Sequence, residues 1–218
     1  MSEIILHHVP GSRSQRVLWL LHELELDFDV RVWPFDKTLR SAEFLALNPA
    51  GRVPALELDG RSIWETGALI EILCERTGRL GRPPGDAERV DWLIWVHFAE
   101  TISQHAATCT QQHLMLREAS MRSPVVMKLE SARIGKCFDA IEARLAGDWL
   151  LSSFSAADVA VGQAAMMARR FHRVGDRPRM AGWIDRIEER DGWRRASDAK
   201  GFYDRDFSRV RRACPMPH

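Results

Sequence analysis

The stretch GRLGRPPGD, residues 78–86, limits how this chain can fold more than any other part of its sequence. It brings several glycines and a Pro-Pro pair close together and has little apolar side chain to bury, so it predicts a linker. Strand-like segments occur only before it, and every longer segment after it has the apolar spacing of helices. The sequence therefore predicts an α/β domain in residues 1–80 and an all-helical domain in residues 88–218.

The first domain alternates between strand-like and helix-like patterns. Asp59-Gly60 is a strong signal for a hairpin turn, and Gly78 is typical of a residue that ends a helix. The predicted order is β-α-β-α-β-β-α. Its elements are a strand at 3–8, a helix at 14–25, a strand at 28–35, a short helix at 41–47, a strand pair within 53–66 and a helix at 66–77.

The charge balance argues against two classes of partner. The 218 residues hold 31 lysines and arginines against 30 aspartates and glutamates, which provides no general attraction for nucleic acid or anionic lipid. The apolar run near the N-terminus is too short for a signal peptide, and we interpret the basic end SRVRRACPMPH as a solvated terminus. We therefore expect a soluble, cytoplasmic protein without nucleic-acid or membrane partners.

The sequence also predicts no metal site. The four cysteines lie far apart, at Cys74, Cys109, Cys137 and Cys214, which favours free thiols. Histidines at 97, 105 and 113 are separated by about 12 Å along a helix, too far to share one ion. His7 and His8 end the first strand with side chains on opposite faces, so we expect one to face inward, the other outward, and no joint role.

Three short segments carry the candidate chemistry. In PGSRSQRVLWLL, Ser12 and Ser14 stand where a loop enters a helix, either as N-caps or as hydroxyls that hold an anion. In RVPAL, a cis Val53-Pro54 bond would leave the Val53 amide and carbonyl accessible. In WETGA, an acid and a hydroxyl, Glu65 and Thr66, begin another helix.

Together these segments resemble the soluble, cytosolic-type glutathione S-transferase family, whose N-terminal domain has the thioredoxin fold. The resemblance depends on PGSRSQRVLWLLHELEL, EFLALNPAGRVPALELDG and IWETGALIEILCER, and FSAADVAVG is similar to the family's S/T-x-x-D capping motif. The loop before the first helix contains no cysteine, and the chain's one tyrosine, Tyr203, is far along the sequence. The chain is therefore most similar to serine-type members of the bacterial and theta/delta kind.

The resemblance implies that Ser12 is the catalytic residue. Serine-type members place their catalytic serine four residues before an arginine, which here is Arg16. A free thiol has a pKa of about 8.5, and a hydroxyl that donates to the sulfur beside a helix N-terminus favours the thiolate. Ser14 is the alternative candidate, and a simple capping role for Ser12 stays open.

The resemblance also implies how glutathione binds. Glu65 would hold the γ-glutamyl ammonium, Thr66 with its amide would hold the carboxylate, and the cysteinyl part would pair with the Val53 main chain before Pro54. The implied partners of the glycine carboxylate are Arg40 and Arg52, although surface arginines are common. The implied electrophile pocket is lined by Val9, Pro10, Phe98, Thr101 and His105, whose alternative role is packing against a neighbouring helix.

The expected activity is attack of a glutathione thiolate on an electrophilic, aromatic or unsaturated small molecule, with a role in detoxification. Glutathione serves as co-substrate, without a metal or organic cofactor, and the resemblance implies a homodimer. Two alternatives stay open. One is a glutathione-dependent isomerase, lyase, dehalogenase or peroxidase; the other is a non-catalytic binding or regulatory module on the same fold.

Overall fold

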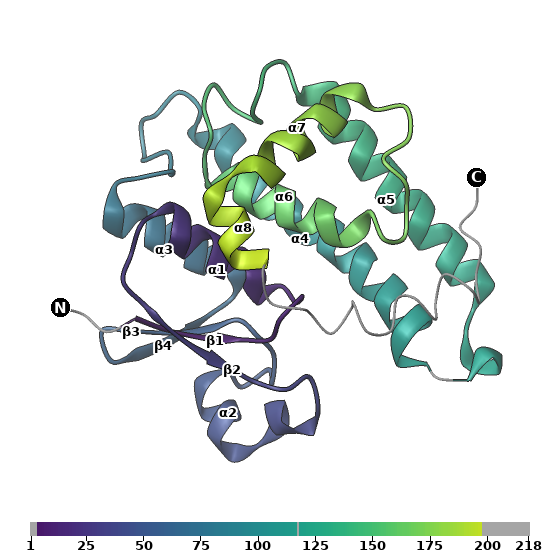
Figure 1. Cartoon of the computed structure of the whole chain (residues 1–218), viewed down its shortest axis with the longest axis horizontal. Helices are drawn as coiled ribbons and strands as arrows, with labels where there is room; N and C mark the ends of the chain where they lie inside the picture. The colour runs from purple at the N-terminus through teal and green to yellow at the C-terminus, as the bar shows by residue number, and fades with distance from the viewer. Residues whose placement is uncertain (1–3, 117, 198–218) are drawn as a thin grey trace. The chain divides into compact units, whose positions relative to one another are not determined.

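A four-stranded sheet forms the centre of the first of two units in the computed structural model, which describes residues 4–116 and 118–197 (Figure 1). The first unit extends to Gly85 and also includes the described residues from Glu189 onward, and the second unit begins at Asp86. The elements up to Gly85 are β1 (Ile4–His8), α1 (Ser14–Glu23), β2 (Asp29–Val32), η1 (Lys37–Arg40), α2 (Ala42–Leu47), β3 (Ala55–Leu58), β4 (Arg61–Trp64) and α3 (Thr66–Thr77). Their order confirms the predicted β-α-β-α-β-β-α arrangement and the thioredoxin-like fold class.

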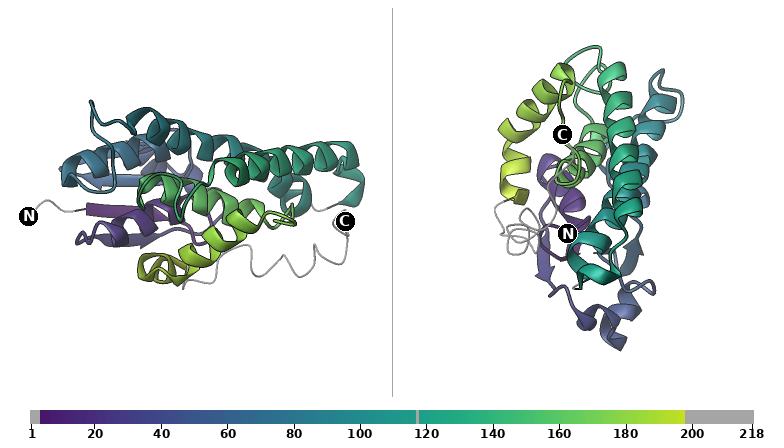
Figure 2. Two further views of the ribbon diagram at one scale, coloured as in Figure 1. Left: turned by 90° about the horizontal axis from the view of Figure 1, so that it is seen from above. Right: turned by 90° about the vertical axis from the view of Figure 1, so that its right-hand side faces the viewer.

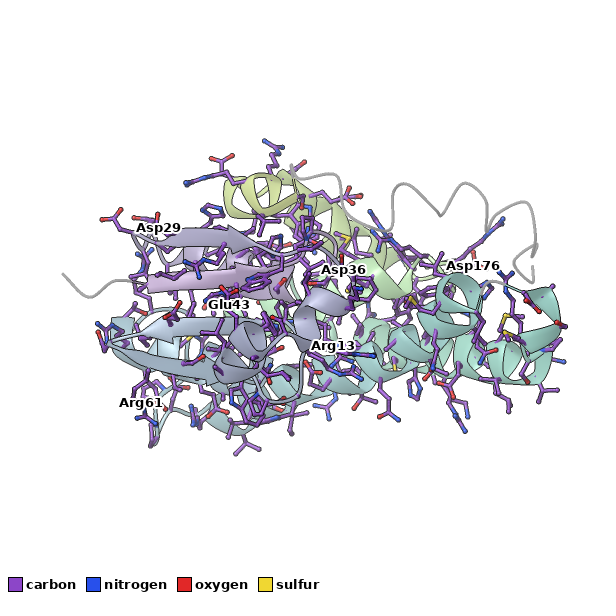
Figure 3. The ribbon with its side chains drawn as sticks, turned by 90° about the horizontal axis from the view of Figure 1, so that it is seen from below. Arg13, Asp29, Asp36, Glu43, Arg61 and Asp176 are labelled. Carbon is purple, nitrogen blue, oxygen red and sulfur yellow. The ribbon has the colours of Figure 1, made fainter. Side chains whose placement is uncertain are left out.

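The sheet has the strand order β2-β1-β3-β4, with β1 parallel to β2 and antiparallel to β3. His7 of β1 faces Ala55 of β3, and Ala55 faces Trp64 of β4. The end of β1, the start of β3 and the end of β4 therefore lie at the same end of the sheet. Asp29 and Arg61, which begin β2 and β4, lie at the opposite end (Figure 3).

Helices cover both faces of the sheet. Figure 1 shows α1 and α3 on one side and α2 on the other. His7 and His8 are 0% and 2% exposed, so the expectation that one of them faces solvent is wrong. Their side chains still have separate surroundings: His7 packs against Trp33 and Phe44, and His8 contacts Ser14. Because both faces are covered, alternation along β1 separates the two histidines without exposing either.

The first unit is completed by α8 (Asp191–Ser197), which packs against α1. The rings of Trp19 and Trp193 meet edge to face, 5.0 Å apart. Glu23 accepts two hydrogen bonds from the Arg190 guanidinium, at 2.8 and 2.6 Å. At Gly192 an added Cβ would lie 2.6 Å from the Glu23 carboxylate, so this close approach requires glycine. The sequence analysis assigned these residues to the all-helical domain of residues 88–218.

The described part of the second unit is helical. It contains α4 (Arg89–Thr110), η2 (Gln111–Met115), η3 (Ala119–Met121), α5 (Pro124–Arg144), α6 (Ala156–Ala168) and α7 (Pro178–Glu189), of which the last residue belongs to the first unit. The long helix α4 packs against α5 and α6, and the views in Figure 2 show α4 and α5 side by side.

The capping motif at the start of α6 forms as its sequence suggested. The Ser155 side chain accepts from a first-turn amide, and the Asp158 carboxylate accepts from the Ser155 amide at 3.0 Å. The other Asp158 oxygen accepts from the Leu150 amide and from the Trp183 indole. This completely buried carboxylate therefore joins α6, α7 and the loop before α6.

Three of the four cysteines are described, and all are buried and unbonded to another cysteine: Cys74, Cys109 and Cys137. Cys214, Tyr203 and the basic end of the chain lie outside the described residues. None of the described helices combines the length and the hydropathy that spanning a membrane requires.

Candidate active site

A tight turn connects β1 to α1 and sets the position of Ser12. The Ser12 amide donates to the Val9 carbonyl at 3.2 Å, and Gly11 has a φ of 73°. Proline at the second position and a positive φ at the third are typical of a type II turn, which explains the Pro10-Gly11 pair. The chain therefore reverses at the end of the sheet and enters α1 at Ser14, two residues after Ser12.

The two serines at this junction have different environments. Ser14 is completely buried, whereas Ser12 is partly exposed. Their hydroxyl oxygens lie 2.8 Å apart, and Ser12 Oγ also accepts from the Ser14 amide at 3.2 Å. Ser12 thus accepts from the first amide of α1 while it is partly exposed, although the N-cap position of the helix is held by Arg13, whose side chain makes no capping hydrogen bond.

His8 stands behind this pair, and sequence reasoning gave it no role. Its Nδ1 lies 2.8 Å from Ser14 Oγ, which also accepts from the Val9 amide at 3.1 Å. Burial lowers the pKa of His8 from 6.5 to about 4, so its ring is neutral near pH 7. The sequence feature that could have indicated this role is the position of His8 at the end of β1, six residues before Ser14. The chain turns back after β1, and this brings Ser14 against the His8 side chain.

The loop before β3 presents the main chain of Val53. The Val53-Pro54 bond is cis, and the half-buried Val53 packs against the apolar cluster that contains Val9. Among the described residues, the amide and carbonyl of Val53 have no hydrogen-bond partner. Val53 therefore lies beside the loop that carries Ser12, and its main-chain amide and carbonyl could pair with an extended peptide.

Asn48 holds this loop in place, a role that the sequence analysis did not assign to it. The buried side chain donates to the Arg52 carbonyl at 2.6 Å and accepts from the Ala50 amide at 2.9 Å. Sequence reasoning recognised Asn48 only as the end of a helix. The stretch NPAGRVP, rich in turn-forming residues, was the available signal, because asparagine often bonds to the main chain of such turns.

The two arginines assigned to glutathione both stand near this loop and are exposed. Arg52 belongs to the loop, and Arg40 ends η1. A Cβ added at Gly51 would lie 3.9 Å from Cγ of Arg40, so Arg40 borders the turn that precedes Arg52. This edge of the first unit therefore offers two cations to a ligand.

Glu65 and Thr66 follow β4 and begin α3 at the same end of the sheet. Glu65 is exposed and has a φ of 75°, a conformation that costs a side-chain-bearing residue of order 1–3 kcal/mol. Thr66 is 4% exposed and is the first residue of α3, where main-chain amides favour an anion. A carboxylate and a helix N-terminus thus stand side by side, as recognition of an ammonium and a carboxylate requires.

The residues assigned to an electrophile pocket belong to both units. Val9 is buried and Pro10 half-buried in the β1–α1 loop. Phe98, Thr101 and His105 lie on α4 of the second unit, where Thr101 is exposed and Phe98 meets Trp95 edge to face. His105 Nδ1 lies 2.6 Å from a Glu130 carboxylate oxygen on α5. The pocket itself stays a prediction.

The described residues contain no group of three or more histidine, cysteine or acidic side chains arranged to hold a metal ion. The end of the sheet itself presents hydroxyl, amide, carboxylate and guanidinium groups.

Comparison with known proteins identifies the same family for both parts of the chain. A model of the N-terminal domain of glutathione S-transferases matches residues 11–76, and a model of the C-terminal domain matches residues 126–186. Together these matches cover more than half of the chain.

Individual relatives agree with this assignment. The chain is 31% identical to glutathione S-transferase 3 of Schizosaccharomyces pombe over 99 residues, which are 44% of this chain and 41% of that protein. It is 26% identical to glutathione S-transferase GstB of Escherichia coli K12, over 85% of this chain and 92% of that protein.

A glutathione transferase from Burkholderia graminis, solved with two glutathione molecules bound per subunit, has the same fold. Its TM-score is 0.81 at 22% identity, with 91% of this chain and 88% of that chain covered. The chain therefore belongs to the enzyme family of the glutathione S-transferases.

Proposed function

We propose that the protein is a cytoplasmic, serine-type glutathione transferase in which Ser12 stabilises the glutathione thiolate. The sulfur attacks an electrophilic carbon of an aromatic or unsaturated small molecule and forms a C–S bond. In substitution the leaving group departs with the electron pair of the bond that breaks. In addition the π electron pair moves to the far atom of the unsaturated system, which then takes up a proton from solvent. The observation that carries the proposal is the serine pair at the start of α1, in which Ser12 is partly exposed and Ser14 is buried.

The difference in exposure favours Ser12 over Ser14 as the donor to sulfur. A thiolate needs a hydroxyl that reaches the surface of the site, and the Ser14 hydroxyl is enclosed by His8, Val9 and Ser12. Ser12 also stands beside the N-terminus of α1, where the helix dipole favours negative charge. Both effects lower the pKa of a thiol bound there.

The rest of glutathione fits the groups at the same end of the sheet. The Val53 main chain would pair with the cysteinyl residue, and Glu65 and Thr66 would hold the ammonium and carboxylate of the γ-glutamyl end. Arg40 and Arg52 would bind the glycine carboxylate. The Burkholderia graminis transferase, which binds glutathione on the same fold, supports this assignment.

A pair of matched serine variants tests the catalytic assignment. We expect Ser12→Ala to reduce kcat/KM with an activated aryl halide at least about tenfold, because a donor to the developing anion is lost. Ser41, which caps α2 by accepting from the Phe44 amide at 3.2 Å, provides the control. Ser41→Ala removes a capping hydroxyl of the same kind away from the serine pair and should leave kcat/KM unchanged. Full turnover by Ser12→Ala would leave Ser12 with a structural role only.

Calorimetry distinguishes the enzyme from a non-catalytic module. We expect glutathione to bind the wild-type chain and to bind Ser12→Ala with similar affinity, since Ser12 acts on the sulfur rather than on the tripeptide as a whole. Absence of binding at millimolar glutathione would instead favour the module. Solution scattering tests the homodimer that we also propose, and a monomeric mass would contradict it.

A further inference from the structure

His8, Ser14 and Ser12 form a continuous chain of hydrogen bonds from the interior to the candidate active site. His8 Nδ1 lies 2.8 Å from Ser14 Oγ, and Ser14 Oγ lies 2.8 Å from Ser12 Oγ. His8 is 2% exposed and Ser14 is completely buried, while Ser12 is partly exposed. The nitrogen of His8 that carries the ring proton therefore determines the direction of each hydrogen bond along this chain, up to Ser12.

The available protons and lone pairs allow two hydrogen-bond arrangements at Ser14. A serine hydroxyl has one proton and two lone pairs, and one lone pair of Ser14 accepts from the Val9 amide at 3.1 Å. In the outward arrangement, His8 Nδ1–H donates to Ser14 and Ser14 donates to Ser12. In the inward arrangement, Ser12 donates to Ser14 and Ser14 donates to an unprotonated His8 Nδ1. The Val9 carbonyl, 3.3 Å from Ser14 Oγ, is a poorer acceptor than either neighbour at 2.8 Å.

The proposed role of Ser12 is compatible with the outward arrangement alone. To donate to sulfur, Ser12 must direct its single proton at the ligand, so its oxygen must act as acceptor toward Ser14. In the outward arrangement Ser12 Oγ accepts from the Ser14 hydroxyl and from the Ser14 amide at 3.2 Å. In this arrangement Ser12 Oγ acts only as an acceptor toward Ser14, so the Ser12 proton is not used between the two serines.

We infer that His8 is a positioning residue of this site, acting as the Nδ1–H tautomer that turns both serine hydroxyls toward the glutathione sulfur. The inference rests on the proposed function, because it takes Ser12 as the donor to sulfur. His8 itself remains buried behind the serines and keeps its proton throughout. Its contribution is directional: a chain in which each member donates to the next strengthens the last donor.

The opposite nitrogen of His8 is consistent with this tautomer. Among the described residues, the buried Nε2 has no hydrogen-bond partner. In the outward arrangement this atom is an unprotonated acceptor, whereas in the inward arrangement it carries a buried N–H without an acceptor. Orphaned buried N–H donors are the rarer defect in folded proteins. Burial also lowers the pKa of His8 to about 4, which keeps the ring neutral near pH 7.

The neighbouring His7 provides a built-in reference with the opposite tautomer. Trp33 Nε1, which can act only as a donor, lies 3.0 Å from His7 Nδ1, so this nitrogen must be the acceptor. His7 Nε2 then carries the proton and donates to Glu57 at 2.8 Å. Two adjacent, equally buried histidines are thus expected to differ only in which nitrogen is protonated.

Nitrogen NMR of the full chain, labelled with ¹⁵N-histidine, tests the tautomer directly. Signals are assigned by their loss in His8→Asn and His7→Asn. We expect an unprotonated Nε2 for His8 and an unprotonated Nδ1 for His7 in the same spectrum at pH 7. A protonated Nε2 on His8 would overturn the inference, whatever the activity of the protein.

A double-mutant cycle tests whether the tautomer acts through Ser12. The readout is the pKa of the bound glutathione thiol, followed by the ultraviolet absorbance of the thiolate, together with kcat/KM. We expect His8→Leu to raise that pKa and to lower kcat/KM about three- to tenfold, the worth of one hydrogen bond. Adding His8→Leu to Ser12→Ala should produce no further change, because both remove the same donor.

The conservative variant and a matched control complete the cycle. His8→Asn retains an N–H that can reach Ser14 and should restore most of the thiol pKa shift, whereas His7→Asn should leave the thiol pKa at its wild-type value. Additive effects of His8→Leu and Ser12→Ala, or a wild-type thiol pKa in His8→Leu, would refute the inference for His8 alone. A wild-type thiol pKa in Ser12→Ala would refute the proposed function instead.

Discussion

Asn48 donates a hydrogen bond of 2.6 Å from its side-chain amide to the main-chain carbonyl of Arg52. The contact fixes the loop that presents the Val53 main chain, and the same side chain accepts from the Ala50 amide. A residue that contacts no proposed ligand group therefore determines the shape of the edge on which glutathione would lie.

Replacement of Asn48 should affect both stability and glutathione binding. Asn48→Ala leaves the Ala50 amide without its acceptor, and we expect a loss of about 1–3 kcal/mol in the free energy of unfolding. We also expect a higher KM for glutathione with a smaller change in kcat, because the Val53 edge becomes less ordered. Urea unfolding and steady-state kinetics measure the two effects. An unchanged KM would mean that the loop keeps its shape without Asn48.

The positive φ of Glu65 predicts a conflict between stability and binding. Glycine adopts such a φ without strain, so Glu65→Gly should raise the free energy of unfolding by about 0.5–1 kcal/mol. The same variant removes the carboxylate proposed to hold the glutathione ammonium and should weaken glutathione binding. Glu65→Gln retains the strained backbone and should weaken binding without the gain in stability. Equal stabilities of the two variants would argue against strain at this position.

Acid should destabilise the protein through His8. Burial lowers the pKa of His8 to about 4 in the folded chain, whereas the unfolded chain takes up a proton near pH 6.5. This contribution to stability is complete above pH 6.5 and is lost as the pH falls from 6.5 to 4. It amounts to about 2 kcal/mol at pH 5 relative to pH 7.

His8→Asn removes this titration, so its urea unfolding midpoint should fall less between pH 7 and pH 5 than that of the wild type. Burial also lowers the pKa values of His22, His113 and His172, so part of the acid sensitivity should remain in the variant. Identical pH profiles for variant and wild type would show that His8 is protonated with an ordinary pKa.

The second unit should depend strongly on the Asp158 carboxylate. Asp158→Ala deprives three buried donors of their acceptor, the Leu150 and Ser155 amides and the Trp183 indole. We expect a loss of about 3–5 kcal/mol, compared with about 1 kcal/mol for Ser155→Ala, which removes only the cap of α6. Denaturant unfolding followed by tryptophan fluorescence measures both. A loss as small as that of Ser155→Ala would show that Asp158 contributes only as a cap.

The order of elements was predictable from sequence because it follows local patterns. Alternating and helical apolar spacing indicated the four strands of the first unit and its helices α1, α2 and α3, and Gly78 ends α3 as expected. The candidate functions of Ser12, Val53, Glu65 and Thr66 came from a family resemblance that local patterns alone do not provide.

Features that depend on distant contacts were not predictable in this way. The outward position expected for one of the two histidines was wrong because α2 covers the sheet face opposite α1, which periodicity along β1 does not reveal. The separation of α8 from α7 depends on contacts of Trp193 and Arg190 with α1. The link from His8 to Ser14 depends on the turn at Gly11, which brings the chain back over the end of β1.

The return of α8 to α1 affects how the protein can be synthesised. Glu23 receives its guanidinium partner from Arg190, which follows it by 167 residues in the chain, and Trp19 meets Trp193 in the same region. A nascent chain that has just left the ribosome through Gly85 therefore lacks the helix that covers α1, so the Trp19 ring lacks Trp193 and the Glu23 carboxylate lacks its guanidinium partner. The first unit therefore begins to be translated before the second but closes only after α8 has been made, so chaperones have time to engage it.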